Sequence, residues 1–242
     1  MRSLAAVLIA MGLALSTSAA EITKETITSG GQARTYHLFA PSPGSEPAPL
    51  LILLHGSGRN GKVLLDHWRS FAAKQGIVLA GPEAIEPEHW QFPADGPVFL
   101  RDVVDDVMKR TAIDRRRVYL FGHSAGANFA VPMALLQSTY FAAAVAHAGG
   151  IANGNEEAIN LATRKVPVSL IVGVRDHALA NARMSHRLMT NHGLHVELVE
   201  IPKHGHDYYR LSKLINEMAW KFLSAHSLEK DAAWISYANI PE

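Results

Sequence analysis

Apolar residues along this chain follow two spacings, and each spacing predicts a different kind of element. Short continuous apolar runs are typical of strands that are buried on both faces of a sheet. Such runs predict strands at 50–54, 77–80, 117–121, 141–147, 166–172 and 195–201. Stretches in which apolar residues recur every three or four positions predict amphipathic helices at 62–75, 97–111, 125–137, 180–192 and 207–225.

The order of these elements predicts the fold class. From residue 50 onward strands alternate with helices, which is the pattern of an α/β protein whose mostly parallel sheet carries helices on both faces. A weaker alternation at 21–29 and 33–40, around a turn of two glycines, predicts a hairpin at one edge. The segment 149–165 has room for a loop or one short helix, so we expect no large cap domain.

The length of the chain suits one α/β domain, which we expect over residues 21–226. A tail at 227–242 follows, and the sequence assigns it no role. Trp234 and Ile235 are large apolar side chains within this tail, and they indicate that it packs against the domain.

The first twenty residues differ from the rest of the chain. Arg2 is followed by an apolar run at 4–15 and by small residues at 16–20. This order predicts a signal peptide over 1–20, cut after Ala20, and hence export to a periplasm or to the exterior. The apolar run is too short to span a bilayer, so no membrane span is expected in the mature protein. The alternative interpretation is a helix of the domain core.

Composition narrows the classes of partner. The chain holds 23 Lys and Arg against 22 Asp and Glu, and without the predicted signal peptide its formal charge is near zero. This balance provides no basic field, so neither nucleic acid nor an anionic membrane is expected as a partner. Cysteine is absent, which excludes disulfides. The 13 histidines show no metal-binding spacing, so no metal and no cofactor are expected.

Residues 122–126 read Gly-His-Ser-Ala-Gly and stand between a predicted strand and a predicted helix. Strand, G-x-S-x-G and helix together indicate a nucleophile elbow, a sharp and strained turn that lifts a serine hydroxyl above a sheet. Gly122 and Gly126 are needed because neighbouring backbone passes close to them. Ser124 is therefore the candidate nucleophile.

A serine nucleophile needs a base and an acid, and in proteins with this elbow they follow in the order acid, then histidine. Asp176 comes directly after the predicted strand 166–172, at the sheet edge where catalytic groups gather. The alternative role for Asp176 is a cap of the next helix. After the last strand we favour His206 over His204 as the base, because Gly205 before His206 permits a sharp turn.

Two backbone N–H groups are expected to stabilise an oxyanion. One belongs to Ala125, directly after the nucleophile. The other belongs to Ser57, in the loop after the strand 50–54, with Gly56 as the alternative. His55 in the same loop is interpreted as structural. An imidazole with an ordinary pKa of about 6.5 can take the serine proton and return it to a leaving group, while the aspartate sets its tautomer.

Four further side chains are candidates for the lining of a substrate pocket. Trp90 and Phe92 lie in the loop before the helix 97–111, and they suit core contacts equally well. His123 lies inside the elbow motif. His204 becomes a residue of the rim if His206 is the base.

These residues resemble the α/β-hydrolase superfamily over nearly the whole chain after residue 20. The segments 53–56, 113–119, 122–126 and 205–206 are similar to small secreted esterases, which include polyhydroxybutyrate depolymerases, feruloyl esterases and carboxylesterases. The resemblance implies a serine esterase that cleaves short acyl, hydroxyalkanoate or hydroxycinnamoyl esters through a Ser-His-Asp triad and an acyl-enzyme. An open site without a cap suits water-soluble esters or polymer chain ends rather than long-chain lipid.

Other functions stay open. A serine peptidase, amidase or thioesterase of the same fold would use the same triad and differ only in its pocket. Ala127 and Asn128 stand where many depolymerases have another glycine, and no cysteine lies near His55, so the depolymerase label is the weakest of the esterase labels. A non-catalytic binding protein is the third alternative. Such proteins usually lack a triad member, whereas this chain keeps all three in order.

Overall fold

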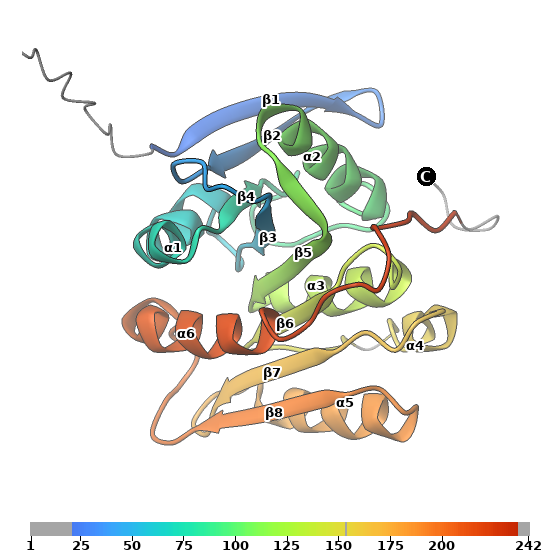
Figure 1. Ribbon diagram of the computed structural model, residues 1–242. Coiled ribbons are helices and arrows are strands. Elements are labelled where there is room, and N and C mark those ends of the chain that lie inside the picture. Colours follow the sequence, from blue (N-terminus) through green and yellow to red (C-terminus); the bar gives the residue numbers. More distant parts are fainter. Residues whose placement is uncertain (1–20, 153, 237–242) are drawn as a thin grey trace, which may run out of the picture.

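The structure of the protein, a computed structural model, describes residues 21–152 and 154–236, so the predicted signal peptide lies outside the described residues. Figure 1 shows one sheet that runs from β1 to β8 in the order β1-β2-β4-β3-β5-β6-β7-β8. The strands are β1 Thr23–Ser29, β2 Gln32–Phe39, β3 Ala48–Leu54, β4 Val78–Pro82, β5 Ile113–His123, β6 Ala143–His147, β7 Val168–Gly173 and β8 Val196–Ile201. The helices are α1 Gly61–Gln75, α2 Pro97–Arg110, α3 Ala125–Leu136, α4 Glu157–Leu161, α5 Leu179–Asn191 and α6 Ser212–Leu223.

The predicted fold class is confirmed. The strands β1 and β2 form the expected antiparallel hairpin, and β2 pairs antiparallel with β4. All further neighbours in the sheet pair in parallel. Among its described residues, the segment between β6 and β7 holds one helix, the short α4.

Helices cover both faces of the sheet, and strand β3 shows why. Its successive side chains point to opposite faces, and all of them from Leu50 to Leu54 are fully buried. Leu50, Ile52 and Leu54 pack in one core with α2, α3 and α4, whereas Leu51 and Leu53 pack in a second core with α1 and α6. Figure 1 shows the two sets of helices on opposite sides of the sheet.

Two element boundaries differ from the predictions by four residues or more. The closing helix does not begin at 207, because the Asp207 carboxylate accepts hydrogen bonds from the Tyr209 and Arg210 amides and bends the chain into a 3₁₀ turn before α6. Strand β5 begins at Ile113 rather than at 117, since pairing with Ala48 on β3 holds this polar segment in the sheet.

The segment 226–236, which we call the C-terminal strap, crosses the amino end of β5 and the carboxyl end of α3 (Figure 1). Leu228 and Ala232 donate backbone hydrogen bonds to Arg116 and Arg115 of β5. The Gln137 side chain exchanges two hydrogen bonds with Ile235, and Trp234 packs edge-on against Tyr140 at 5.2 Å between ring centroids. The expectation that Trp234 and Ile235 dock the tail is confirmed.

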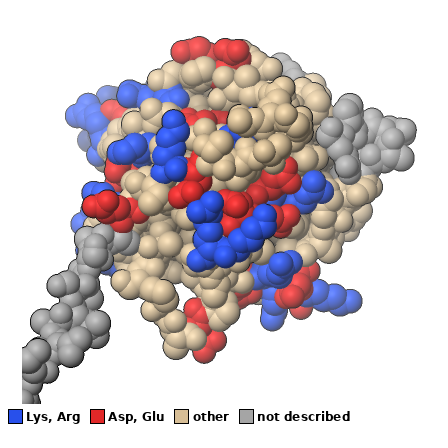
Figure 2. All heavy atoms as spheres, turned by 90° about the horizontal axis from the view of Figure 1, so that it is seen from above, with Lys and Arg blue, Asp and Glu red and all other residues tan. Residues whose placement is uncertain are grey.

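Charged side chains of both signs are interspersed on the face that β1 and α2 form (Figure 2). On this face Arg110 lies 2.9 Å from both Glu25 and Asp106. Such pairing neutralises the charges locally, which fits the balanced composition. Within residues 21–152 and 154–236, no helix has both the length and the apolar character that crossing a bilayer requires.

Candidate active site

Ser124 occupies a strained turn between β5 and α3. Its backbone has φ 56° and ψ −115°, a conformation that side chains other than glycine rarely adopt. The turn is sharp because its two glycines allow close approach. A Cβ atom on Gly122 would lie 2.1 Å from the Gly126 carbonyl oxygen, and one on Gly126 would lie 2.1 Å from the Leu54 oxygen. The geometry is that of the elbow expected from the motif.

The structure brings Ser124, His206 and Asp176 together in one line of hydrogen bonds. His206 Nε2 lies 2.8 Å from Ser124 Oγ, and its Nδ1 lies 2.9 Å from Asp176 Oδ1. The Asp176 side chain is fully buried at the end of β7, whereas His206 is partly exposed in the loop after β8. With Nδ1–H donating to the carboxylate, Nε2 is free to accept the serine proton.

Asp176 also makes the kind of hydrogen bond expected of a helix cap, which was its alternative role. Its Oδ1 accepts a hydrogen bond from the Ala178 amide at 2.8 Å, just before α5. This bond fixes the carboxylate while it faces His206. His204, the alternative base, is buried on the other side of the loop, and its ring lies 5.8 Å from that of His147.

The loop after β3 lies against the nucleophile. A Cβ atom on Gly56 would lie 3.3 Å from Ser124 Cβ, so the backbone at Gly56 and Ser57 passes beside the serine. Ser57 is exposed in a turn, and Ala125 is the first residue of α3, where an amide has no acceptor within its helix. Both predicted donors therefore stand on loops or helix ends that border Ser124.

The His55 side chain is buried and holds this loop through hydrogen bonds, in keeping with the structural role expected for it. Its ring is 1% exposed, its Nδ1 donates to the Gly56 oxygen, and its Nε2 accepts from the Ala84 amide. Burial lowers the pKa of His55, which keeps the ring neutral and preserves this donor and acceptor pattern. The Trp90 indole donates a hydrogen bond to the His55 oxygen at 2.9 Å and ties a second loop to the first.

Asp95, which the sequence did not single out, holds that second loop in place. Its fully buried carboxylate accepts hydrogen bonds from the Ile85 and Gln91 amides and pairs with Arg34 of β2. No local pattern marks this residue, because its charged partner lies far away along the chain. The loop it stabilises carries Trp90 toward the site.

An apolar groove of about 430 Å³ runs along the outer side of α3, between the loop that holds Trp90 and the helix α4. Trp90 stacks on Phe129 at 5.4 Å, and Phe92 at the mouth is 46% exposed. The predicted pocket residues Trp90 and Phe92 thus line one groove. A larger hollow of about 750 Å³ lies under the loop between β2 and β3 and contains none of the predicted site residues.

His123 and His204 do not line this groove, which corrects the pocket assignment made for them. His123 is 6% exposed and His204 is 8% exposed, because both rings turn inward beneath the site. His123 Nδ1 lies 3.0 Å from His147 Nδ1, so one of these rings donates and the other accepts. His147 is fully buried, and no sequence motif indicated this pairing, since the partner belongs to the neighbouring strand.

The buried histidine pair predicts a loss of stability in mild acid. Burial, together with the charge of His206, lowers the pKa of His123 to about 4, and burial lowers the pKa of His147 well below its ordinary value. The unfolded chain therefore binds these protons first as the pH falls from about 6.5 to about 4. The free energy of unfolding should decrease by about 3 kcal/mol from His123 alone over this range.

Urea unfolding at pH 7.5, 6.0 and 5.0 measures this effect, since most carboxylates keep their charge there. The variant His147→Phe removes one of the two titrating rings and should show a shallower decrease. A free energy of unfolding that stays constant from pH 7.5 to 5.0 in the wild type would contradict the prediction.

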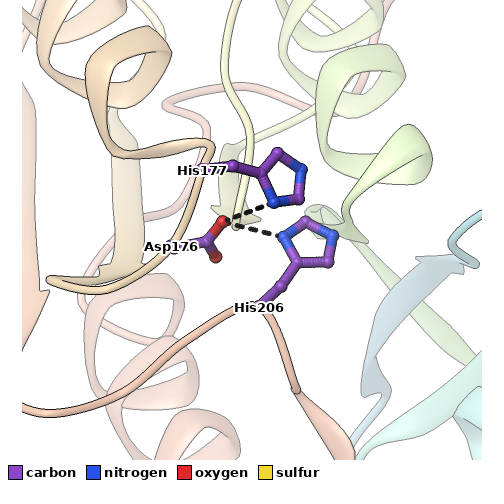
Figure 3. Close-up of side chains that lie close together, drawn as sticks. All are labelled: Asp176, His177 and His206. Carbon is purple, nitrogen blue, oxygen red and sulfur yellow. Dashed lines mark hydrogen bonds and ion pairs between the residues drawn. The ribbon is translucent and has the colours of Figure 1, made fainter.

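Three side chains at the site could together hold a metal ion, although the sequence predicted none. Asp176, His177 and His206 each direct one ligand atom into the same small volume (Figure 3). Among the described residues this is the one group of its kind. His177 was missed because a lone histidine after an aspartate is not a metal-binding pattern.

The chain is similar to several known hydrolases in sequence or in fold. No protein-family model matches the chain. Over 153 residues, or 62% of its length, the chain is 30% identical to a bifunctional acetylxylan esterase/xylanase of Neocallimastix patriciarum, and it spans only 22% of that enzyme.

Solved structures show the fold. A ferulic acid esterase matches 85% of this chain and 98% of its own, with a TM-score of 0.66 and 17% identity. A poly(3-hydroxybutyrate) depolymerase of Bordetella parapertussis matches 84% and 90%, with a TM-score of 0.67 and 17% identity. An acylaminoacyl peptidase of Pyrococcus horikoshii matches 90% and 44%, with a TM-score of 0.69 and 15% identity. The chain has the fold that these hydrolases share, as its motifs predicted.

Proposed function

We propose that this chain, which has the α/β-hydrolase fold, is a serine hydrolase that cleaves carboxylic esters. The observation that carries the proposal is the unbroken line from Asp176 through His206 to the strained Ser124, with contacts of 2.9 and 2.8 Å. An activated serine nucleophile requires a base in contact with it and a group that orients the base, and these three residues meet both conditions. The similarity to an acetylxylan esterase supports an ester as the substrate.

The chemical steps follow from the positions of these groups. Ser124 Oγ attacks the ester carbonyl carbon while its proton passes to His206 Nε2, and the resulting oxyanion accepts hydrogen bonds from the Ala125 and Ser57 amides. The tetrahedral intermediate then collapses, its C–O bond to the alcohol breaks, and His206 returns the proton to that alcohol. Water attacks the acyl-enzyme and loses a proton to His206. The bond from the acyl carbon to Ser124 Oγ then breaks, His206 returns the proton to Ser124 and the acid is released.

The apolar groove along α3 suits the acyl or aryl part of the ester. Phe129 lies five residues after Ser124, and at about 1.5 Å per residue the near end of the groove is about 7.5 Å along the helix axis from the nucleophile. The stacked Trp90 and Phe129 offer aromatic faces there. Short acyl, hydroxyalkanoate and hydroxycinnamoyl groups fit such a groove, and the absence of a cap over the described site argues against long-chain lipid.

Hydrolysis of nitrophenyl esters of increasing acyl length, and of one methyl hydroxycinnamate, tests the proposal. We expect the highest kcat/KM on short acyl or hydroxycinnamoyl esters. A maximum on long-chain emulsions would contradict the open-site argument. Amides with the same acyl groups belong in the same series, because faster cleavage of the amide would instead favour the peptidase alternative. Inactivity of a well-folded chain on every ester and amide would favour a binding protein.

Phe92 provides a test of the groove itself. Replacing Phe92 with alanine removes an aromatic face at the mouth and should raise KM for the hydroxycinnamate by about two- to tenfold. Ile85→Ala is the matched control, since Ile85 is 41% exposed on the same loop but does not line the groove. If steady-state kinetics shows that both changes raise KM for the hydroxycinnamate equally, the aryl group binds outside this groove.

A further inference from the structure

His177 is an exposed ring at the carboxylate of the proposed triad. Its side chain is 78% exposed, whereas that of the adjacent Asp176 is fully buried. Nevertheless its Nδ1 turns back to within 3.5 Å of Asp176 Oδ1, and its ring lies 4.3 Å from that of His206 (Figure 3). His177 has no role in the proposed mechanism.

The three side chains present ligand atoms at distances close to those of a transition-metal site. His206 Nδ1 and His177 Nδ1 lie 2.9 and 3.5 Å from Asp176 Oδ1, and all three atoms lie within 4.8 Å of one another. In a tetrahedral zinc site the bonds of about 2.0–2.2 Å separate neighbouring ligand atoms by about 3.3–3.5 Å. The observed separations of 2.9 and 3.5 Å differ from this spacing by at most about 0.4 Å.

We propose that Asp176, His177 and His206 form an inhibitory site for Zn²⁺ or a similar divalent transition-metal ion. Two imidazole nitrogens and one carboxylate oxygen form a ligand set that zinc accepts, with water in the fourth position. The exposed His177 ring gives an ion access from solvent. Mg²⁺ and Ca²⁺ require more oxygen ligands than the site offers, so they bind weakly.

The inhibitory effect follows from the proton on His206. In the neutral ring this proton sits on Nδ1, where it is donated to Asp176, and Nε2 faces Ser124 as an acceptor. A metal ion bound to His206 Nδ1 uses the lone pair of that nitrogen, so the proton of the neutral ring must sit on Nε2 instead. The ring then donates toward Ser124 Oγ and can no longer take its proton. The Nδ1–H bond breaks and an Nε2–H bond forms, so the neutral His206 ring keeps its single proton and no oxidation state changes.

The inhibition part of this inference rests on the proposed function, whereas metal binding does not. We would titrate the purified chain with ZnCl₂ by calorimetry in a buffer that does not bind metal, and measure ester hydrolysis in parallel. The informative variant is His177→Phe, which keeps an aromatic ring against His206 and removes the ligand. His192→Phe is the matched control, because His192 is an exposed ring at the far end of α5. The activity of each variant is expressed relative to its own value without metal.

We expect one Zn²⁺ per chain, and His177→Phe should raise both the dissociation constant and the half-inhibitory concentration about tenfold or more. His192→Phe should leave both unchanged, and Mg²⁺ at equal concentration should not inhibit. Equal zinc affinity in the wild type and His177→Phe would overturn the inference. Absence of ester hydrolysis together with His177-dependent zinc binding would overturn the proposed function and retain the site.

Discussion

Alanine in place of Ser124 is expected to lower kcat for ester hydrolysis by about 10⁴- to 10⁶-fold. The change removes the atom that attacks the carbonyl and leaves only the contribution of the oxyanion donors and of binding. His206→Ala should reduce kcat to within about tenfold of the same level, because a nucleophile and its base act as one unit. KM should change little in either variant, since neither side chain lies in the apolar groove.

His204→Ala is the control for this experiment, because His204 lies two residues away in the same loop and its buried ring lies near His147. Labelling with a sulfonyl fluoride, followed by mass spectrometry, provides a second measurement. The wild type should gain one adduct on Ser124, and Ser124→Ala should gain none. A severe loss in His204→Ala with a mild loss in His206→Ala would reverse the assignment of the base.

Asparagine in place of Asp176 is expected to lower kcat by about 10⁴-fold at neutral pH. The two side chains have nearly the same shape, but an amide nitrogen facing His206 Nδ1 donates a hydrogen bond where the carboxylate accepts one. The ring then carries its proton on Nε2, toward Ser124, and cannot serve as a base. The Ala178 amide donates to the same Oδ1 atom in the wild type, so it loses its acceptor when the amide nitrogen takes that position, and some loss of stability at the start of α5 is expected as well.

Asp207→Asn is the matched control, because this neighbouring acid only caps the 3₁₀ turn before α6. Its kcat should stay within about threefold of the wild type. Urea unfolding of both variants separates a catalytic effect from a folding effect. An Asp176→Asn variant with wild-type kcat and intact stability would exclude the proposed orienting role.

Much of the fold could be predicted because the relevant signals are local. The apolar run that became β3 needs burial on both faces, and only a sheet covered on both sides provides that. The elbow is local as well, since Gly122, Ser124 and Gly126 form it with the adjoining strand. Asp176 and His206 could be predicted as candidates from their positions after strands that end at the same edge of a parallel sheet.

What could not be predicted depends on contacts between distant segments. Asp95 looks like any loop acid until Arg34 is placed beside it. His123 looked like a pocket residue because a motif does not reveal which face of the strand its side chain takes, and His147 on the next strand draws it inward. The start of β5 was missed for a related reason, since polar residues there are held by pairing with β3 and not by burial.

The C-terminal strap has a consequence for how this protein can be attached to a surface or to another protein. It lies across the amino end of β5, and the strand is 11 residues long, so about 30 Å of sheet separates it from Ser124 at the other end. A support or partner coupled through the strap would approach the molecule from the side opposite the nucleophile. The sheet edge that carries Ser124 would then face outward, toward the surrounding medium.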